Sequence, residues 1–199
     1  MWLDKEKTKL AIVIADVAGH DMSAAIPAVM FSGMLEYVVE EKSPGAMLCR
    51  CNEALCRRMK GRNFITCCIG VIDLIDKTLV WSKAGHPGIY HYRERERTVA
   101  ELEMGSLPLG ISSKQQYEDW QVELGLGDML VFHTDGLVEA CNAQDEMLGY
   151  DRMAEFVLEL GRDSVSSVEG ISRMMAGAHG FMGNREHEDD ITLVVAKVT

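Results

Sequence analysis

The chain has 199 residues, and 47% of them are hydrophobic, which is enough apolar material for one domain with a sizeable core. Its formal net charge of -11 at pH 7 excludes a surface built to bind nucleic acid or an anionic membrane, because phosphate groups are bound through Lys and Arg. The sequence contains no apolar stretch of about 18 residues or more and does not begin like a signal peptide, so we expect a cytoplasmic protein without membrane contact.

The N-terminal part of the chain predicts a strand followed by two helices. Residues 10–15 form a continuous apolar run that ends at Asp16, which is typical of a buried strand. Apolar residues at helical spacing over 26–38 predict the first helix. Pro44 marks the start of the second helix, because proline is well placed at the first helical position, and its apolar face extends to Met59.

From residue 64 onward the apolar pattern changes to that of strands. The predicted strands are 64–73, 78–84, 88–92, 98–102, 117–124 and 129–134. Strands that follow one another directly favour antiparallel pairing. Two helices over 150–160 and 168–182 and a last strand over 191–195 complete the chain. This order predicts an α+β fold, a sandwich of two antiparallel β-sheets flanked by pairs of α-helices.

The six cysteines show neither a C-x-x-C pair nor the spacing of a zinc site. They are Cys49, Cys51, Cys56, Cys67, Cys68 and Cys141. We expect them to be reduced and mostly buried, as is usual for thiols in a cytoplasmic protein.

Three aspartates at the ends of apolar strands are candidates for one metal site. Asp16 follows the run 10–15, Asp135 follows 129–134, and Asp189 opens the last strand. Each of them alone would be read as a cap or turn residue. Converging carboxylates repel one another unless a cation or a proton lies between them, and oxygen ligands favour hard ions such as Mg²⁺ or Mn²⁺. Two such ions support phosphoryl hydrolysis, which needs little else from the protein.

Three histidines lie close to these segments and are interpreted as structural. His20, His86 and His133 are of a type found more often in turns or packing than in catalysis. Pro87 makes His86 part of a rigid turn. None of the three is assigned a catalytic role.

Five segments, taken in chain order, carry a family resemblance. They are residues 14–20 (IADVAGH), 84–87 (AGHP), 107–110 (LPLG), 127–140 (GDMLVFHTDGLVEA) and 189–193 (DDITL). Together they resemble the successive motifs of the type 2C metal-dependent Ser/Thr protein phosphatases, and in particular their bacterial SpoIIE-like branch. The resemblance covers nearly the whole chain, and five motifs in the right order are stronger evidence than any one of them.

The resemblance implies a role for each matching residue. Asp16 would bridge two Mn²⁺ or Mg²⁺ ions, and the carbonyl of Val17 would bind one of them. Asp135 and Asp189 would complete the other site, so that Asp16, Asp135 and Asp189 act in catalysis through bound metals and water. Asp190 is the weaker ligand candidate of its pair, because relatives often carry Asn there.

The same resemblance implies the reaction. A water held by the metals would attack the phosphorus of phosphoserine or phosphothreonine without a covalent enzyme intermediate. Gly19 would keep the loop beside the metals tight. His20 does not match the histidine that related eukaryotic enzymes use as a general acid.

The sequence departs from the family pattern at its start. Family members carry a further motif, Gly-Gly-Asp with a second Asp close behind, on a strand that precedes the run 10–15. This sequence starts at Met1 without that motif, and Asp4 falls in the polar turn that would follow it, so Asp4 is not expected to be a ligand. We therefore expect residues 1–199 to be a single SpoIIE-like phosphatase domain that is N-terminally truncated, lacks its N-terminal strand and binds its second metal weakly.

The resemblance also implies partners. The substrate would be a phosphorylated regulatory protein, commonly an anti-sigma-factor antagonist, and a sensor domain would lie upstream. The two helices after Asp16 resemble the pair through which upstream domains or homodimer contacts control the metal site. Two other functions remain open: a non-catalytic phosphatase-like interaction module, which the absent Gly-Gly-Asp favours, and a metal-dependent hydrolase of small phosphate esters.

Overall fold

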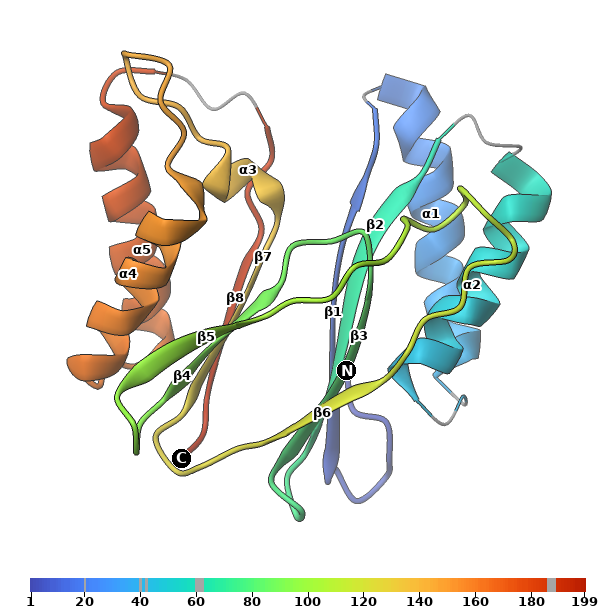
Figure 1. Ribbon diagram of the computed structural model, residues 1–199. Helices are drawn as coiled ribbons and strands as arrows, with labels where there is room; N and C mark the ends of the chain where they lie inside the picture. Colours follow the sequence, from blue (N-terminus) through green and yellow to red (C-terminus); the bar gives the residue numbers. More distant parts are fainter. Residues whose placement is uncertain (20, 40, 42, 60–62, 186–188) are drawn as a thin grey trace. The chain divides into compact units, whose positions relative to one another are not determined.

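The computed structural model describes residues 1–19, 21–39, 41, 43–59, 63–185 and 189–199 (Figure 1). The chain divides into two compact units. The first unit comprises Met1–His86 and Met104–Glu123, and the second comprises Pro87–Glu103 and Leu124–Thr199. Among the described residues, no helix combines the length and the apolarity needed to cross a bilayer.

The first unit is a four-stranded antiparallel sheet that packs against two helices (Figure 1). Its strands are β1 (Lys9–Val17), β2 (Ile65–Asp73), β3 (Thr78–Ala84) and β6 (Trp120–Glu123), in the order β1-β2-β3-β6. The helices α1 (Asp21–Val38) and α2 (Pro44–Met59) connect β1 to β2. Pro44 is the first helical residue of α2, as its missing N–H predicts.

Side chains along β1 and β2 alternate between a helix side and the opposite face of the sheet. Val13, Ala15 and Val17 pack against the apolar core of this unit, together with Cys67 and Ile69 of β2. Successive side chains of a strand point to opposite faces. The residues between them in sequence therefore lie on the face turned away from α1 and α2, and Asp16 is one of these.

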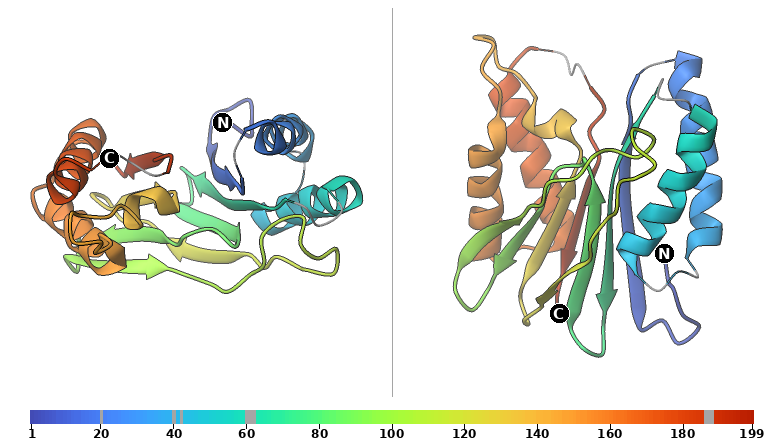
Figure 2. Two further views of the ribbon diagram at one scale, coloured as in Figure 1. Left: turned by 90° about the horizontal axis from the view of Figure 1, so that it is seen from above. Right: turned by 45° about the vertical axis from the view of Figure 1, so that its right-hand side comes forward.

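The second unit is another four-stranded antiparallel sheet with its own helices (Figure 2). Its strands are β4 (Ile89–Arg93), β5 (Thr98–Leu102), β7 (Met129–His133) and β8 (Leu193–Lys197), in the order β5-β4-β7-β8. Its helices are α3 (Asp135–Val138), α4 (Gly149–Arg162) and α5 (Ser167–Met182). Buried Tyr90, Tyr92 and Val131 from the sheet meet Val157 and Met174 from the helices, so the apolar stripes of α4 and α5 form the core of this unit.

The two antiparallel sheets and the paired helices confirm the predicted fold class, while several boundaries differ. β1 continues through Asp16, because that residue still pairs with β2. The strand predicted over 117–124 is limited to β6, and the last strand begins at Leu193, two residues later than expected. The short helix α3 directly after β7 was not predicted, since four residues are too few to show a helical period.

The first residues of the chain pair with β1. Trp2 forms an antiparallel bridge with Leu10, and the amide of Ala11 donates to the carbonyl of Met1 at 2.8 Å. Asp4 closes the intervening turn, since its carboxylate accepts hydrogen bonds from the backbone amides of Thr8 (2.8 Å) and Lys9 (3.1 Å). Asp4 is thus occupied as a turn residue, the role that its polar surroundings in the sequence indicate.

All six cysteines are free. Cys51 and Cys67 are buried in the apolar core of the first unit, and Cys68 is buried on the other face of β2. Burial raises the pKa of the Cys51 thiol to about 12, so this thiol stays protonated and unreactive at neutral pH.

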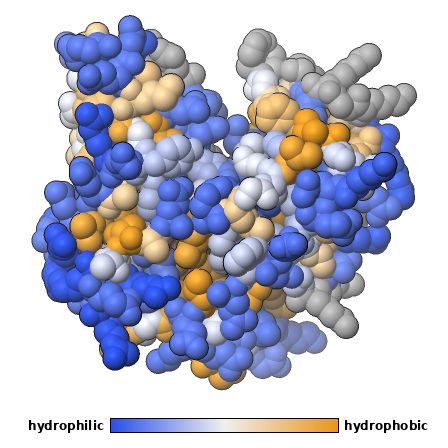
Figure 3. Space-filling model, viewed as in Figure 1, coloured by the Kyte–Doolittle hydropathy of each residue, from blue (hydrophilic) through white to orange (hydrophobic). Residues whose placement is uncertain are grey.

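Apolar side chains are exposed along one side of α1. Hydrophilic side chains cover most of the face drawn in Figure 3, with apolar patches between them. On α1, Val29 and Tyr37 are 74% and 82% exposed, and Ile26 is exposed on the same side of the helix. Helix α1 therefore differs from α4, whose apolar residues Met153, Val157 and Leu160 are buried.

Gly161 of α4 sits against the ring of Tyr92, and this contact predicts a large effect of a single methyl group. A Cβ atom at position 161 would lie 2.4 Å from ring carbons of Tyr92, in a fully buried position. We expect Gly161→Ala to lower the free energy of unfolding by about 1–3 kcal/mol, as overpacking does in tight cores. The matched control is Gly180→Ala in α5, where no atom lies within 4 Å. It should raise stability by up to about 1 kcal/mol through helix propensity. Urea denaturation of both variants measures the difference, and equal stabilities would contradict the packing.

Candidate metal centre

Asp135 stands where β7 gives way to α3. Thr134 is the residue before the helix, and Asp135 lies in its first turn. Gly136 follows, and a Cβ atom there would lie 2.5 Å from the carbonyl oxygen of Asp190 and 3.4 Å from Cβ of Asp189. Glycine at 136 therefore lets the segment of Asp189 and Asp190 lie directly against the start of α3. The structure thus places Asp189, distant in sequence, close to the start of α3 where Asp135 lies.

Thr134 holds the two segments in place. Its buried hydroxyl donates to the carbonyl oxygen of Asp190 at 3.2 Å and accepts from the amide of Thr192 at 2.9 Å. Its own amide donates to the carbonyl of Thr192 at 3.1 Å. Three hydrogen bonds thus hold residues 189–192, the segment just before β8, beside Asp135.

Replacing Thr134 with Val removes the hydroxyl and keeps the branched shape. The carbonyl of Asp190 and the amide of Thr192 then each lose a partly buried hydrogen bond. Because one such bond contributes about 0.5–1.5 kcal/mol, we expect Thr134→Val to lower the free energy of unfolding by about 1–3 kcal/mol. Thr134→Ser keeps the hydroxyl and should cost well under half as much. Thermal unfolding of the two variants gives the comparison. If Thr134→Val is as stable as Thr134→Ser, the hydrogen bonds of the Thr134 hydroxyl do not stabilise the protein.

Glu139 is a third carboxylate close to Asp135 and Asp189, and the sequence interpretation missed it. Burial raises the pKa of Glu139 above its usual value, and the negative charges of Asp135 and Asp189 raise it further. The signal in the sequence was its position four residues after Asp135, which brings two side chains onto one side of a helical turn. The charges of Asp135 and Asp189 are thus unfavourable to an ionised Glu139, and a nearby cation would relieve this repulsion.

Asp189 and Asp190 differ in their roles. The carboxylate of Asp189 accepts the amide of Asp190 at 2.8 Å, which orients it next to Gly136. Asp190 is held through its backbone carbonyl by Thr134, and both aspartates are exposed, so only their hydrogen bonds distinguish them. This arrangement is in keeping with Asp189 as the ligand of the pair, which stays a prediction.

Asp16 and Val17 lie in the first unit at the end of β1. Val17 pairs with Ile65, and the amide of Ala18 donates to the carbonyl of Phe64 at 3.0 Å, so the chain leaving β1 stays attached to the start of β2. Gly19 then has φ 111°, a conformation that favours glycine. Gly19 thus has the backbone freedom that a tight loop after Asp16 would require.

The turn after β3 places a buried histidine beside β2. His86 is 2% exposed, and its Nδ1 lies 2.9 Å from the hydroxyl oxygen of Thr66. Lys83 donates from Nζ to the carbonyl oxygen of His86 at 2.6 Å. Thr66 is the residue of β2 that pairs with Asp16. The first unit thus places Asp16, Thr66 and His86 on neighbouring segments of one sheet.

His133 is a packing residue, as interpreted from the sequence. It is buried, its ring stacks on Tyr90 with centroids 5.5 Å apart, and its Nδ1 lies 3.0 Å from the carbonyl oxygen of Thr134. Burial lowers the pKa of His133, so the ring is neutral at neutral pH. His20 lies outside the described residues.

The described residues contain no group of three or more His, Cys, Asp and Glu side chains that could already hold a metal ion. Asp135 and Asp189 belong to the second unit, while Asp16 and Val17 belong to the first. The candidate ligands predicted from the sequence therefore fall into two sets, one in each unit, and their role as ligands stays a prediction.

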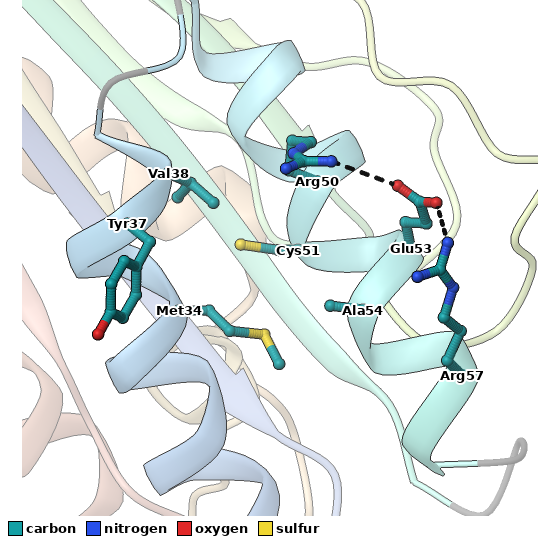
Figure 4. Close-up of a pocket in the computed structure, with 8 residues that line it drawn as sticks. All are labelled: Met34, Tyr37, Val38, Arg50, Cys51, Glu53, Ala54 and Arg57. Atoms are coloured by element: carbon teal, nitrogen blue, oxygen red, sulfur yellow. Dashed lines mark hydrogen bonds and ion pairs between the residues drawn. The ribbon is translucent and has the colours of Figure 1, made fainter.

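A groove between α1 and α2 offers a different kind of surface (Figure 4). Its volume is about 250 Å³, and on the α2 side Glu53 forms ion pairs with Arg50 and Arg57 along the helix. The lining residues are Met34, Tyr37, Val38, Arg50, Cys51, Glu53, Ala54 and Arg57. None of the predicted ligands lines this groove, and it has no carboxylate pair for a cation.

Comparison with known families and structures identifies the chain. The family described as Stage II sporulation protein E (SpoIIE) matches residues 6–199. The chain belongs to the SpoIIE family. A curated relative of this SpoIIE-family chain is phosphoserine phosphatase RsbU of Bacillus subtilis (strain 168), which is 25% identical over 198 residues. The match covers 97% of the chain and 57% of RsbU, so the chain spans little more than half of that relative's length.

Solved structures share the fold of the SpoIIE-family chain. The SiaA-PP2C domain of Pseudomonas aeruginosa has a TM-score of 0.82 at 17% identity, over 96% of this chain and 81% of that one. The PP2C phosphatase domain of SpoIIE from Bacillus subtilis, with a fragment of its regulatory domain, has a TM-score of 0.79 at 22% identity, over 96% and 55%. RsbX in complex with magnesium has a TM-score of 0.71 at 18% identity, over 94% and 80%. The fold is that of the PP2C-type serine/threonine phosphatases, as the sequence motifs implied.

Proposed function

We propose that this chain is a metal-dependent protein serine/threonine phosphatase that removes phosphate from phosphoserine or phosphothreonine on a regulatory protein. The observation that carries the proposal is the pairing of Asp135 with Asp189, held by Thr134 and Gly136, in a member of the SpoIIE family. Few structural reasons exist to keep like charges together at the junction of a strand and a helix. A cation-binding site is one such reason.

We assign the ligands residue by residue. Asp16 and the carbonyl of Val17 come from the end of β1, and Asp135 and Asp189 come from the second unit. We propose that these residues hold two Mn²⁺ or Mg²⁺ ions, with Asp16 as a ligand of both. Support comes from the oxygen-only donor set, and from RsbX, a structural neighbour that was solved in complex with magnesium.

In this proposal the residues of the chain attract and place the cations for phosphate hydrolysis. When bound, the divalent ions neutralise phosphate charge and lower the pKa of water to supply the nucleophile. Asp135 and Asp189 provide the negative charge that attracts those ions in a chain whose net charge is -11. Thr134 keeps Asp189 beside Asp135, and Gly136 leaves room for that approach. The described residues around Asp135 supply no positively charged partner, so binding of an anionic substrate depends on the cations.

We extend the proposal to partners. RsbU is a phosphoserine phosphatase, and the SpoIIE structure includes a regulatory domain. By analogy, we propose a phosphorylated regulatory protein, such as an anti-sigma-factor antagonist, as substrate in the cytoplasm, and control by a sensor domain upstream. The exposed apolar side of α1 would serve either that domain or a homodimer. That residues 1–199 act as a single phosphatase domain likewise remains a proposal.

Phosphate release from a phosphoserine peptide tests this function. Release should require Mn²⁺ or Mg²⁺ and stop when EDTA is added, because the donor set has no other way to hold phosphate. Comparison with p-nitrophenyl phosphate separates a protein phosphatase from a hydrolase of small esters, which would prefer the small substrate. An absence of hydrolysis at saturating Mn²⁺ would favour the non-catalytic interaction module.

A further inference from the structure

A row of three side chains crosses the first sheet on the face turned away from α1 and α2. Asp16 of β1 and Thr66 of β2 are direct partners in the antiparallel register. Directly opposite residues have Cβ atoms about 4.5–5.5 Å apart on the same face of the sheet. His86 follows next in the row, because its Nδ1 lies 2.9 Å from Oγ1 of Thr66.

The turn that carries His86 is held rigidly. Gly85 has φ 65°, and a Cβ atom there would lie 2.5 Å from Cγ of Pro108. The amide of Gly85 donates to Oγ of Ser106 at 3.1 Å, and that hydroxyl donates to the carbonyl of Lys83 at 2.7 Å. Lys83 Nζ donates to the carbonyl oxygen of His86, and Thr66 contacts its Nδ1. The backbone and the ring of His86 are therefore both held in place.

The hydrogen bond between Thr66 and His86 is shielded from water. Thr66 is 9% exposed and His86 is 2% exposed, so neither group has ready access to bulk water. A threonine hydroxyl has one proton to donate and lone pairs to accept with. If Nδ1 of His86 carries the ring proton and donates to Oγ1, the Thr66 proton is left to turn toward the carboxylate opposite. Ligands to metals are commonly oriented by such hydrogen bonds from residues behind them.

We propose that Thr66 and His86 are positioning residues for Asp16, with His86 orienting the Thr66 hydroxyl and Thr66 orienting the carboxylate that binds the cations. This inference rests on the proposed function, since it gives Asp16 its role as metal ligand. Neither residue touches the substrate. Their effect is therefore expected in the affinity for the divalent cation, and in turnover at limiting cation, rather than in the KM for the phosphopeptide.

Calorimetric titration of Mn²⁺ alone into the 199-residue chain tests the proposal. Thr66→Val removes the hydroxyl and keeps the branched shape suited to a strand, and it should raise the Mn²⁺ dissociation constant by about 10–100-fold. Thr66→Ser keeps the hydroxyl and should stay within about threefold of the parent chain. The matched control is Thr78→Val at the far end of β3, which should leave the dissociation constant unchanged.

Two variants at position 86 give an independent readout. His86→Asn places an amide nitrogen near the position of Nδ1 and should retain most of the Mn²⁺ affinity, whereas His86→Phe should lose it to the same degree as Thr66→Val. Circular dichroism identifies any variant that fails to fold, and the folded variants at either position decide the result. Retention of Mn²⁺ affinity in Thr66→Ser and His86→Asn distinguishes a positioning role from a merely structural one.

Asp16→Ala separates failure of this inference from failure of the proposed function. If Asp16→Ala weakens Mn²⁺ binding while folded Thr66→Val and His86→Phe bind like the parent chain, the positioning role is wrong and the metal site stands. If the parent chain binds no Mn²⁺, or Asp16→Ala binds it equally well, the proposed function fails and takes the inference with it.

Discussion

Replacing Asp135 with Asn should lower phosphatase turnover by more than about 100-fold while the protein stays folded. Residues that merely orient a metal ligand already cost about 10–100-fold in affinity or activity when they are changed, and Asp135 is proposed as a ligand itself. Asn has nearly the same shape but lacks the negative charge that attracts a divalent cation. Phosphate release from a phosphoserine peptide at fixed Mn²⁺ is the measurement.

Although Asp135→Asn should lose activity, we do not expect it to lose stability. Burial raises the pKa of Glu139, and the negative charges of Asp135 and Asp189 raise it further, so the charge of Asp135 is unfavourable to an ionised Glu139. Removing one charge should therefore leave the free energy of unfolding of the metal-free protein unchanged or raise it. A carboxylate kept for stability would behave in the reverse way, because its loss would destabilise the protein.

The control for Asp135→Asn is Asp76→Asn, which changes an exposed aspartate in the turn between β2 and β3. That variant should keep full turnover and full metal affinity. Undiminished turnover in Asp135→Asn would remove Asp135 from the mechanism, whatever its effect on stability.

Asp16→Ala should weaken Mn²⁺ binding more than Asp190→Ala does. Asp16 lies on the face of the first sheet away from the helices and is proposed to bridge both ions, so its loss should affect both sites. Asp190 is held through its backbone, by Thr134 at its carbonyl and by Asp189 at its amide, and these bonds survive truncation of the side chain. Calorimetry with Mn²⁺ alone measures both variants, and the reverse order of affinities would overturn this choice of ligands.

Apolar periodicity predicted most of the fold, because each sheet and each helix pair has a clear pattern of buried residues. Tyr90 and Tyr92 lie two positions apart on β4 and pack into one core with Val131 of β7, as the two-residue period of a strand requires. The pattern could not predict α3, which is one turn long, nor the start of β8 at Leu193. There the chain is held by the hydroxyl of Thr134, a contact between residues almost sixty positions apart.

The candidate site was predicted in part. Aspartates after apolar strands, in a recurring motif order, identified Asp16, Asp135 and Asp189 as candidates, and the structure brings the last two together. Glu139 escaped notice because its closeness to Asp189 arises only once β7 and β8 pair. His86 was interpreted as a turn residue, and it is one, but its bond to Thr66 depends on how β3 and the turn after it pair with β2. Side-chain partners across strands cannot be deduced from spacing along one strand.

Asp16, Asp135 and Asp189 are all proposed to be ligands of divalent cations. Anomalous diffraction at the manganese edge, from crystals of the chain grown with Mn²⁺, tests this proposal most directly. The account predicts anomalous peaks within coordination distance, about 2.0–2.2 Å, of carboxylate oxygens of Asp16 and of Asp135 and Asp189. Peaks that lie elsewhere, or contact with only one of the two ligand sets, would contradict it.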